Sequence, residues 1–176
     1  GWGGGGGGGG GGGLLCGGGG GGGGRLTCLL AQVPELVAAV PDTDAILCKN
    51  LLLKAKKKKD EDDTMLWLVV AAHDTPTNVK KIQKALGYAN ITVRFAADKY
   101  LEANLGVVKG SVTPFATMND TAVQVNVVLD EKLVGKPKLA FHPLTNEATT
   151  FISYDGLTKF LTAVNHGHFT VMDLTA

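Results

Sequence analysis

The sequence predicts an α+β domain whose mixed, largely antiparallel sheet is curved or forms a partial barrel and is flanked by helices. Apolar strand-like runs follow one another directly in some places and are separated by helical patterns in others. This irregular order argues against a repeating βαβ fold, and no internal repeat is visible. With 176 residues, the chain is long enough for one well-buried domain and short for two.

The first 24 residues contain most of the 26 glycines in the chain. Residues 3–13 and 17–24 are unbroken glycine runs, and their match to GxGxxG is trivial without a strand and a helix around it. We favour the interpretation that these glycines stand for positions whose side chains are not known; a natural low-complexity linker or tag is the alternative. We therefore treat residues 1–30 as an unassignable glycine-rich segment and expect one functional domain over 31–176.

The charge balance and the cysteines narrow the class of protein. Seventeen basic and 16 acidic residues give no broad nucleic-acid or membrane footprint. No apolar run approaches transmembrane length, so we expect no membrane association. Cys16, Cys28 and Cys48 are odd in number and show no CxxC spacing, which suits a reducing compartment. We therefore expect a cytoplasmic location.

The first readable elements are a short helix and two strands. Residues 33–40 (VPELVAAV) carry an early proline and helical apolar spacing. Residues 45–53 and 65–72 are mostly apolar and predict strands, joined by the charged segment 54–63. The lysine run in that segment could grip phosphate, but charge runs at loop tips are more often solubility features.

The middle of the chain predicts two helices around a short strand. Thr77 is expected to cap a helix that ends at Gly87. Residues 91–96 predict a strand, and 98–106 a helix that its final glycine terminates. The Gly-Ser and Thr-Pro content of 107–115 predicts a loop.

The last third predicts three strands, one helix and a closing strand. Valines at alternate positions of 123–129 share one face, as a half-buried strand requires. Residues 138–143 and 149–154 predict two more strands. Asp155 is expected to cap the last helix, and 169–174 to close the chain as a strand.

Several common chemistries find no support in the sequence. Neither Ser111 nor Ser153 lies in GxSxG, and no P-loop motif occurs. His166 and His168 could begin a metal site, but two ligands without a spaced third are weak evidence, and a polar turn is the favoured interpretation. We expect no metal and no cofactor. Cys48 is expected in the core.

Three stretches remain, each with an ordinary structural explanation when taken alone. In CKNLLLK (48–54), Lys49 could be an edge lysine that extends to water and Asn50 a bulge residue. In FHPLTNEATTF (141–151), His142 could be a core histidine with satisfied hydrogen bonds. The third stretch is GSVTPF (110–115). His73, in AAHDTP, is more simply a turn residue.

Together, KNLLLK, GSVTPF and FHPLTNEATT resemble the YbaK family of aminoacyl-tRNA deacylases in order and spacing. The family includes free-standing editing proteins and the editing insertion of bacterial-type prolyl-tRNA synthetases. The Lys-Asn pair and the His-Pro-Leu-x-Asn-x-Ala-Thr run are most similar to the branch that removes alanine from mischarged tRNA(Pro). The resemblance covers residues 31–174, and the combination of three motifs is far more specific than any one of them.

The resemblance implies catalytic roles for four residues. Lys49 would hold a phosphate or the terminal adenosine region as a point charge. Asn50 and His142 would orient the aminoacyl group and the terminal ribose. Gly110 would allow the backbone N–H groups of its loop to approach the ester carbonyl.

The resemblance also implies contacts to the substrate and to partners. The implied substrate-binding residues are Lys54, Ser111, Val112, Thr113, Pro114 and Asn146. The implied partners are the acceptor end of a mischarged tRNA and prolyl-tRNA synthetase, either free or covalently fused. The near-neutral charge indicates a domain that binds mainly the acceptor end of the tRNA, or one that relies on the synthetase to bind the rest of the tRNA. Deacylation of cysteine or serine from the same tRNA, and a non-catalytic domain that binds tRNA or the synthetase, are the alternatives.

Overall fold

The computed structural model describes residues 44–56, 64–88 and 91–175. The predicted helix at 33–40, the predicted boundary at residue 30 and the tip of the charged segment (57–63) lie outside these ranges.

The described residues contain one mixed sheet of seven strands, as the sequence predicted. The strands are β1 (Ile46–Lys56), β2 (Thr64–Ala72), β3 (Thr92–Phe95), β4 (Val125–Asp130), β5 (Leu139–Phe141), β6 (Thr150–Ile152) and β7 (Thr170–Met172). Their order is β6-β5-β1-β2-β4-β7, and β3 also pairs with β1. The β1–β2, β1–β3 and β5–β6 pairs are antiparallel, whereas β1–β5, β2–β4 and β4–β7 are parallel. The longest pairing, β1 with β2, is antiparallel.

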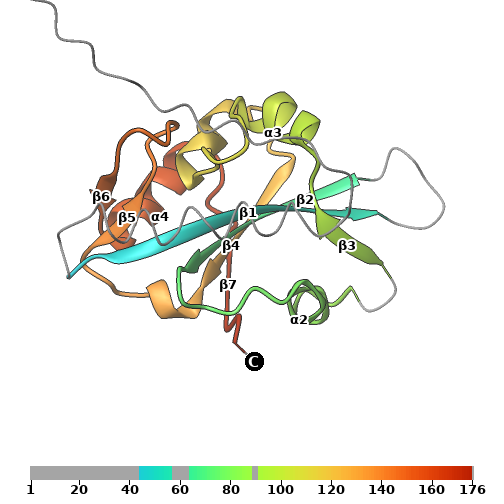
Figure 1. Ribbon diagram of the computed structural model, residues 1–176, viewed down its shortest axis with the longest axis horizontal. Coiled ribbons are helices and arrows are strands. Elements are labelled where there is room, and N and C mark those ends of the chain that lie inside the picture. The colour runs from blue at the N-terminus through green and yellow to red at the C-terminus, as the bar shows by residue number, and fades with distance from the viewer. Residues whose placement is uncertain (1–43, 57–63, 89–90, 176) are drawn as a thin grey trace, which may run out of the picture.

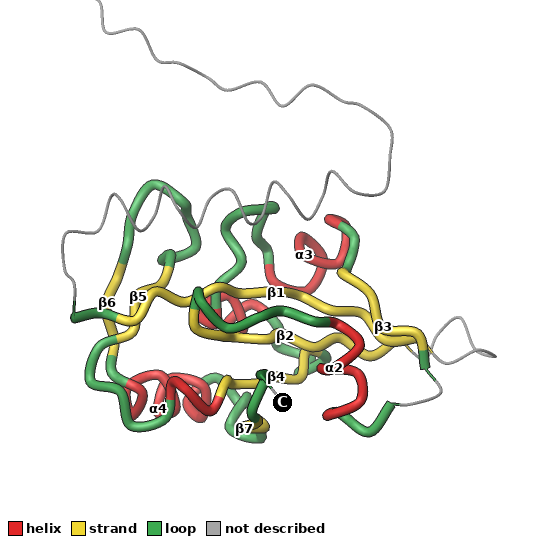
Figure 2. The backbone as a smooth tube through the Cα atoms, turned by 60° about the horizontal axis from the view of Figure 1, so that its bottom comes forward, coloured by secondary structure: helices red, strands yellow, loops and turns green. Residues whose placement is uncertain are grey.

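The long strand β1 has a divided edge on the side away from β2. Its first residues, Ile46 and Leu47, pair with β5, and residues 53–56 pair with β3. Figure 2 shows β5 and β6 beside one end of β1 and β3 beside the other. The Lys49–Asn50 pair therefore lies between two neighbouring strands, at a point where no described strand pairs with that edge.

Helices cover the two faces of the sheet unequally (Figure 1). One face packs against α3 (Asp98–Leu105), α4 (Tyr154–Ala163) and the 3₁₀ helix η1 (Pro114–Asn119), and we call it the α3 face. The other packs against α2 (Val79–Ala85), and we call it the α2 face. Because successive residues of a strand point to opposite faces, each strand contributes to both cores. A second 3₁₀ helix, η2 (Glu131–Leu133), follows β4.

Two predicted helix caps are wrong by one or two residues. Asn78, not Thr77, caps α2, and its side-chain oxygen accepts from the backbone N–H groups of Lys80 and Lys81. Ser153, not Asp155, caps α4 and accepts from the N–H of Gly156. In both cases a side chain able to cap stands closer to the true start of the helix.

The predicted helix ends are confirmed at two glycines. Gly106 follows α3 with φ +61°, and Gly87 lies just beyond α2 with φ +77°. Both angles lie in the left-handed region, which favours glycine.

The predicted strand at 123–129 begins later than expected. Val123 has φ +52° and is 46% exposed, and β4 starts at Val125. The cause is Asp120, whose carboxylate accepts from the N–H groups of Gln124 and Val125 and so closes a turn in front of the strand. Within the described ranges, no helix is both long and apolar enough to cross a membrane.

Candidate active site

Asn50 connects β1 to the loop that the sequence singled out. Its side chain lies on the α3 face, is 9% exposed, and donates from Nδ2 to the carbonyl oxygen of Val112 at 3.0 Å. The amide oxygen Oδ1 is buried and has no hydrogen-bond partner among the described residues. A buried acceptor without a partner is costly to folding, so it marks a position that a ligand could satisfy.

The 110–114 loop presents its backbone rather than its side chains. Gly110 has φ +94°, which explains the glycine at this position. The next four residues are buried, with exposed fractions that include 0% for Thr113 and 8% for Val112. The Thr113 hydroxyl, like the Asn50 amide oxygen, is buried without a partner among the described residues. The N–H of Ser111 donates to the carbonyl oxygen of Val108, so the Thr113 hydroxyl is the group in this loop that a bound molecule could satisfy.

The 3₁₀ helix η1 was not predicted, and it fixes the end of this loop. Pro114 is its first residue, where a missing N–H has no cost. The ring of Phe115 packs edge-on against Phe141 at 5.8 Å and against Phe160 at 5.3 Å between ring centroids. The loop is thus tied to β5 and α4 as well as to β1.

A buried pair, His166 with Asp120, holds the other end of η1. The two residues are 3% and 4% exposed, and Nε2 of His166 lies 3.1 Å from Oδ2 of Asp120. Nδ1 of His166 lies 2.9 Å from the carbonyl oxygen of Val164. Both ring nitrogens of His166 thus lie within hydrogen-bond distance of oxygen atoms, and the pair joins the end of η1 to the segment after α4.

This pair corrects the predicted polar turn at His166 and His168. His166 is buried and bonded to Asp120, whereas only His168 is exposed. In the described part of the chain, no group of three or more His, Cys, Asp or Glu is placed to hold a metal ion. A histidine flanked by glycine predicts a turn well, but a distant carboxylate partner leaves no local signal in the sequence.

His142 follows directly after β5 and is not a core histidine. It is partly exposed, and its Nδ1 lies 3.1 Å from the carbonyl oxygen of Ala148. Since a carbonyl only accepts, Nδ1 carries the proton and Nε2 of the neutral ring is an acceptor. If the parallel β1–β5 register continued two residues beyond Leu47–Ala140, His142 would lie level with Lys49. Asn146, four residues further on, is exposed.

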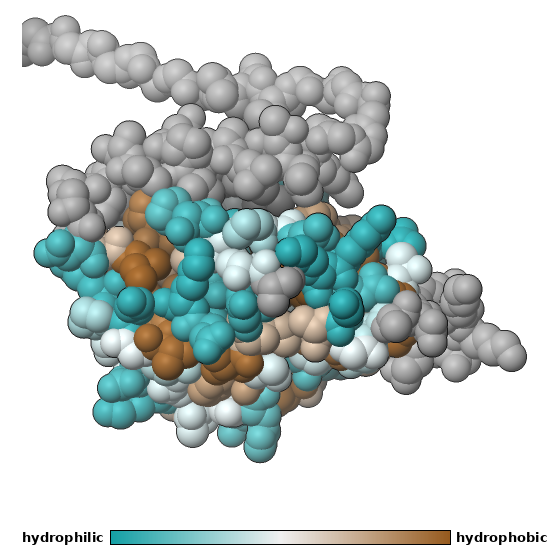
Figure 3. Space-filling model, turned by 90° about the horizontal axis from the view of Figure 1, so that it is seen from below, coloured by the Kyte–Doolittle hydropathy of each residue, from teal (hydrophilic) through white to brown (hydrophobic). Residues whose placement is uncertain are grey.

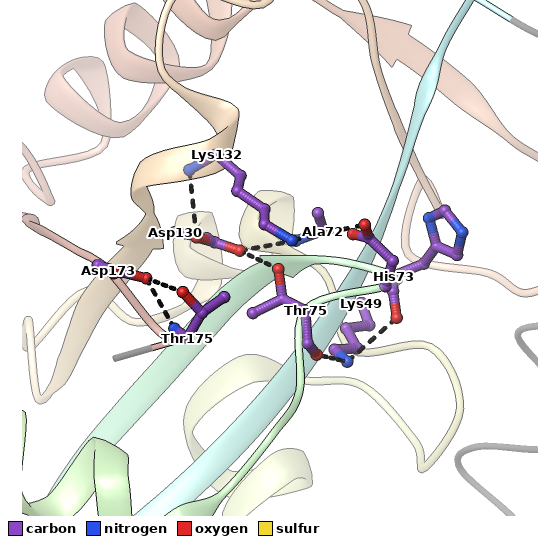
Figure 4. A network of polar contacts seen from close by, with 9 residues as sticks. Lys49, Ala72, His73, Thr75, Asp130, Lys132, Asp173 and Thr175 are labelled. Carbon is purple, nitrogen blue, oxygen red and sulfur yellow. Dashed lines mark hydrogen bonds and ion pairs between the residues drawn. The ribbon is translucent and has the colours of Figure 1, made fainter.

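Lys49 points away from Asn50, to the α2 face. Its partner on β2 is Ala71, a residue of the core on that face, whereas Asn50 pairs with Val70 on the other. The ammonium of Lys49 donates to the carbonyl oxygens of His73, at 3.1 Å, and Thr75 (Figure 4). The structure therefore separates the two side chains that the sequence motif places side by side.

The environment of Lys49 is a polar network around the buried Asp130. Asp130 is 0% exposed and accepts from the N–H of Ala72, the hydroxyl of Thr75 and the N–H of Lys132 (Figure 4). Burial lowers the pKa of Lys49 below its ordinary value. The nearby Asp74 and Asp130 oppose this shift, and Lys132 adds to it. Lys49 and Asp130 together fix the turn that follows β2.

Lys54 lies on the same face of β1 as Asn50. Its ammonium contacts the hydroxyl of Tyr100 on α3 and lies 4.2 Å from the centroid of that ring. By contrast, Cys48 is buried, as predicted, and burial raises the pKa of its thiol. His73 is an exposed turn residue, also as predicted.

The structure thus brings together part of the predicted site. Asn50 and the Gly110–Pro114 loop are in contact, and Lys54 lies four residues along the same face. Lys49 lies on the opposite face, and Asn146 makes none of the contacts described for this site. Sequence reasoning missed Asp120, His166, Asp130 and Tyr100. Aspartates at the start and end of an apolar strand are recognisable turn signals, but their long-range partners are not.

The comparisons with known proteins agree with the fold and the motifs. A family model for the aminoacyl-tRNA editing domain matches residues 30–160. The prolyl-tRNA editing protein ProX of Acetoanaerobium sticklandii is 37% identical over 108 residues, which cover 61% of this chain and 64% of ProX. The match therefore spans less than two thirds of ProX.

Two further similarities extend over more of the chain. Prolyl-tRNA synthetase associated domain-containing protein 1 of Danio rerio is 35% identical over 136 residues, 76% of this chain and 70% of that protein. A crystal structure of a proposed trans-editing enzyme for prolyl tRNA synthetase superposes with a TM-score of 0.55 at 18% identity, covers 85% of this chain and 93% of that one, and shows a shared fold. The chain belongs to the aminoacyl-tRNA editing domain family.

Proposed function

We propose that this protein is a trans-editing hydrolase that removes the amino acid from mischarged tRNA(Pro), with Ala-tRNA(Pro) as its main substrate. The family membership supports an editing role, and the name of ProX supports prolyl-tRNA as the target. The preference for alanine rests on the resemblance of the Lys49–Asn50 and His142 motifs to the alanine-removing branch.

One observation carries the proposal: Asn50 joins β1 to the 110–114 loop and leaves an amide oxygen buried and unpartnered. The hydroxyl of Thr113 in the same loop is also without a partner among the described residues. An aminoacyl ester brings an α-amino group, which can donate to these oxygens. The loop N–H groups then face the carbonyl, where negative charge develops.

The reaction needs no covalent nucleophile, because an aminoacyl ester is already activated. Water adds to the carbonyl carbon, the tetrahedral intermediate collapses, and the ribose oxygen leaves with a proton. Nε2 of His142 can accept the proton of the attacking water or bond to a ribose hydroxyl, since Nδ1 is held by the carbonyl of Ala148. Positioning and stabilisation of the oxyanion supply the rest of the acceleration.

Discrimination by size explains the need for a second site. A synthetase site built for proline cannot strongly reject a smaller amino acid, because each missing methylene is worth only about 1–3 kcal/mol. A small editing pocket can admit alanine and exclude proline. The burial of Val112, whose carbonyl oxygen accepts from Asn50, is consistent with a small pocket.

Lys49 takes a different role in this proposal from the one its motif implies. Its ammonium is bonded to two backbone carbonyls on the α2 face, so it supports β1 and the 73–75 turn. Direct contact with a phosphate would require those bonds to open. A cytoplasmic location and a partnership with prolyl-tRNA synthetase, free or fused, also belong to the proposal.

The experiment is a deacylation time course on tRNA(Pro) charged with alanine, with cysteine and with proline. We expect loss of alanine alone, and a fall in rate of about 10²–10⁴ for His142→Ala without a change in unfolding free energy. Faster loss of cysteine would move the protein to the cysteine-specific branch. No loss from any of the three, with folding confirmed by circular dichroism, would favour a non-catalytic binding domain.

A further inference from the structure

Three cationic side chains and one aromatic ring gather on the α3 face, further along β1 from Asn50. Lys54 lies on β1, Arg94 on β3, and Lys99 and Tyr100 at the start of α3. Arg94 is the cross-strand partner of Lys54, so the two side chains lie on the same face. The ammonium groups of Lys54 and Lys99 lie 4.2 Å and 5.2 Å from the centroid of the Tyr100 ring. We call these four residues the Tyr100 cluster.

The three cations of the Tyr100 cluster form no ion pair within the described part of the chain. None of Lys54, Arg94 and Lys99 forms an ion pair with a carboxylate of the described residues. Two ammonium groups beside one ring repel each other, and the attraction of a ring for a cation is only about 0.5–1 kcal/mol at an exposed site. An anion bound between them would remove the repulsion. Lys99 and Arg94 are exposed and Lys54 is partly so, and an anion could therefore reach them.

The position of the Tyr100 cluster indicates which anion it binds. Lys54 and Asn50 are four residues apart on one strand and point to the same face, which places them roughly 13 Å apart. A stacked nucleic-acid strand advances about 3.4 Å per nucleotide, so this span corresponds to a few nucleotides. A strand whose last ribose lies at Asn50 would therefore bring its preceding phosphates to the Tyr100 cluster.

We infer that the Tyr100 cluster binds the single-stranded 3′ end of the tRNA just before its terminal nucleotide. The cations would contact phosphates, and the partly exposed ring of Tyr100, which lies beside two of the ammonium groups, would contact a base, as aromatic side chains do in proteins that bind single strands. The resemblance already implied a phosphate contact for Lys54; Arg94, Lys99 and Tyr100 are new. The inference rests on the proposed function for the identity of the strand, but its test does not require hydrolysis.

The test measures binding of an uncharged RNA hairpin that copies the acceptor stem, with and without its single-stranded 3′ end. Fluorescence anisotropy over a series of KCl concentrations gives the Kd and its salt dependence. We expect Lys99→Ala and Arg94→Ala each to lower the slope of log Kd against log salt by about 0.7, the value for one phosphate contact on a single strand. Lys159→Ala, an exposed lysine on α4, removes the same charge elsewhere and should leave the slope unchanged.

The aromatic contact is tested separately. Tyr100→Ala should weaken binding at least about fivefold, whereas Tyr100→Phe keeps the ring and should bind within about twofold of the wild type. A thermal melt of Tyr100→Ala checks folding, because Tyr100 also packs against the core of the α3 face. Lys99 and Arg94 are exposed, so their variants carry the inference even if Tyr100→Ala unfolds.

Two results would overturn the inference. The first is a salt slope for Lys99→Ala and Arg94→Ala that equals that of Lys159→Ala. The second is that the variants lose as much affinity for the hairpin without the single-stranded end as for the hairpin with it. The Tyr100 cluster would then bind the duplex. If binding changes as expected but the wild type hydrolyses none of the charged tRNAs, the proposed function fails and the binding surface stands.

Discussion

The two faces of β1 at Lys49 and Asn50 differ in how completely their polar groups are satisfied. On the α2 face, the ammonium of Lys49 is bonded to two carbonyls, and Asp130 accepts three hydrogen bonds. On the α3 face, Asn50 and Thr113 each leave a buried oxygen without a described partner. Further along the α2 face, Nε1 of Trp67 is also buried without a described partner, so the contrast holds for the surroundings of Lys49 and Asn50 and not for the whole faces. Our proposal assigns the substrate to the unsatisfied oxygens beside Asn50.

Figure 3 shows the side of the molecule that lies at the bottom of Figure 1. Hydrophilic side chains cover much of it, with smaller hydrophobic patches between them. Each face also carries one deeply buried aspartate, Asp130 on the α2 face and Asp120 beside η1. The four predictions below use these aspartates and the Lys49–Asn50 pair to test the comparison.

The largest expected effect is that of His166→Ala. It removes the imidazole from the buried carboxylate of Asp120, which keeps its two backbone N–H donors, and removing one member of a buried pair typically costs about 3–5 kcal/mol of stability. Urea denaturation measures the loss. Because η1 and the 110–114 loop depend on this anchor, the folded fraction should also deacylate more slowly; unchanged activity would show that the loop is held without it.

Asn50→Ala should reduce activity more than stability. It removes the bond to Val112 and the free amide oxygen, so we expect the rate of deacylation to fall by about 10²–10³, as for loss of a positioned donor at a catalytic site. The unfolding free energy should fall by only about 1 kcal/mol, since one hydrogen bond is lost. Single-turnover kinetics and denaturation of the same preparation separate the two effects. If the fraction of unfolded Asn50→Ala accounted for all of its lost activity, the placement of the substrate site on the α3 face would be contradicted.

Asp130→Asn should behave in the opposite way. The amide of asparagine cannot accept from all three donors that surround Asp130, so the unfolding free energy should fall by about 2 kcal/mol. We expect deacylation per folded molecule to stay within about twofold of the wild type, because the α2 face holds no substrate in the proposal. A large fall in the deacylation rate constant of fully folded Asp130→Asn would contradict the proposal that the substrate binds on the α3 face.

Lys49→Met gives the smallest effect and adds a dependence on pH. Loss of two hydrogen bonds to the 73–75 turn should cost about 1 kcal/mol near neutral pH. Because burial lowers the pKa of Lys49 in the folded state, the unfolded chain binds more protons in the range below its ordinary value of 10.5. The wild type should therefore gain stability relative to the variant as the pH rises through that window. Denaturation at several pH values measures the unfolding free energy of the wild type and of Lys49→Met. If the wild type instead lost stability relative to the variant with rising pH, the burial of the ammonium would be contradicted.

The sequence predicted the elements of the fold better than their contacts. Strand alternation and terminal glycines such as Gly106 are local signals, and they located most helices and strands to within a few residues. Successive side chains of a strand point to opposite faces, so Lys49 and Asn50 must point apart. The motif alone nevertheless suggested that the two residues share a role. The His166–Asp120 pair could not be predicted, because each partner is far from the other in sequence and both resemble ordinary turn residues.

The divided edge of β1 has a consequence for the order in which the molecule folds. The β1–β2 hairpin joins neighbouring segments, but Leu47 pairs with Ala140, and such distant contacts form slowly because a long loop must close first. The segment that carries His142, directly after β5, would therefore join β1 only after most of the chain has left the ribosome. Pulse-labelled hydrogen exchange during refolding should protect the amides of β2 before those of β5. The chain would then hold a stable hairpin early and complete the candidate site only as its last strands dock.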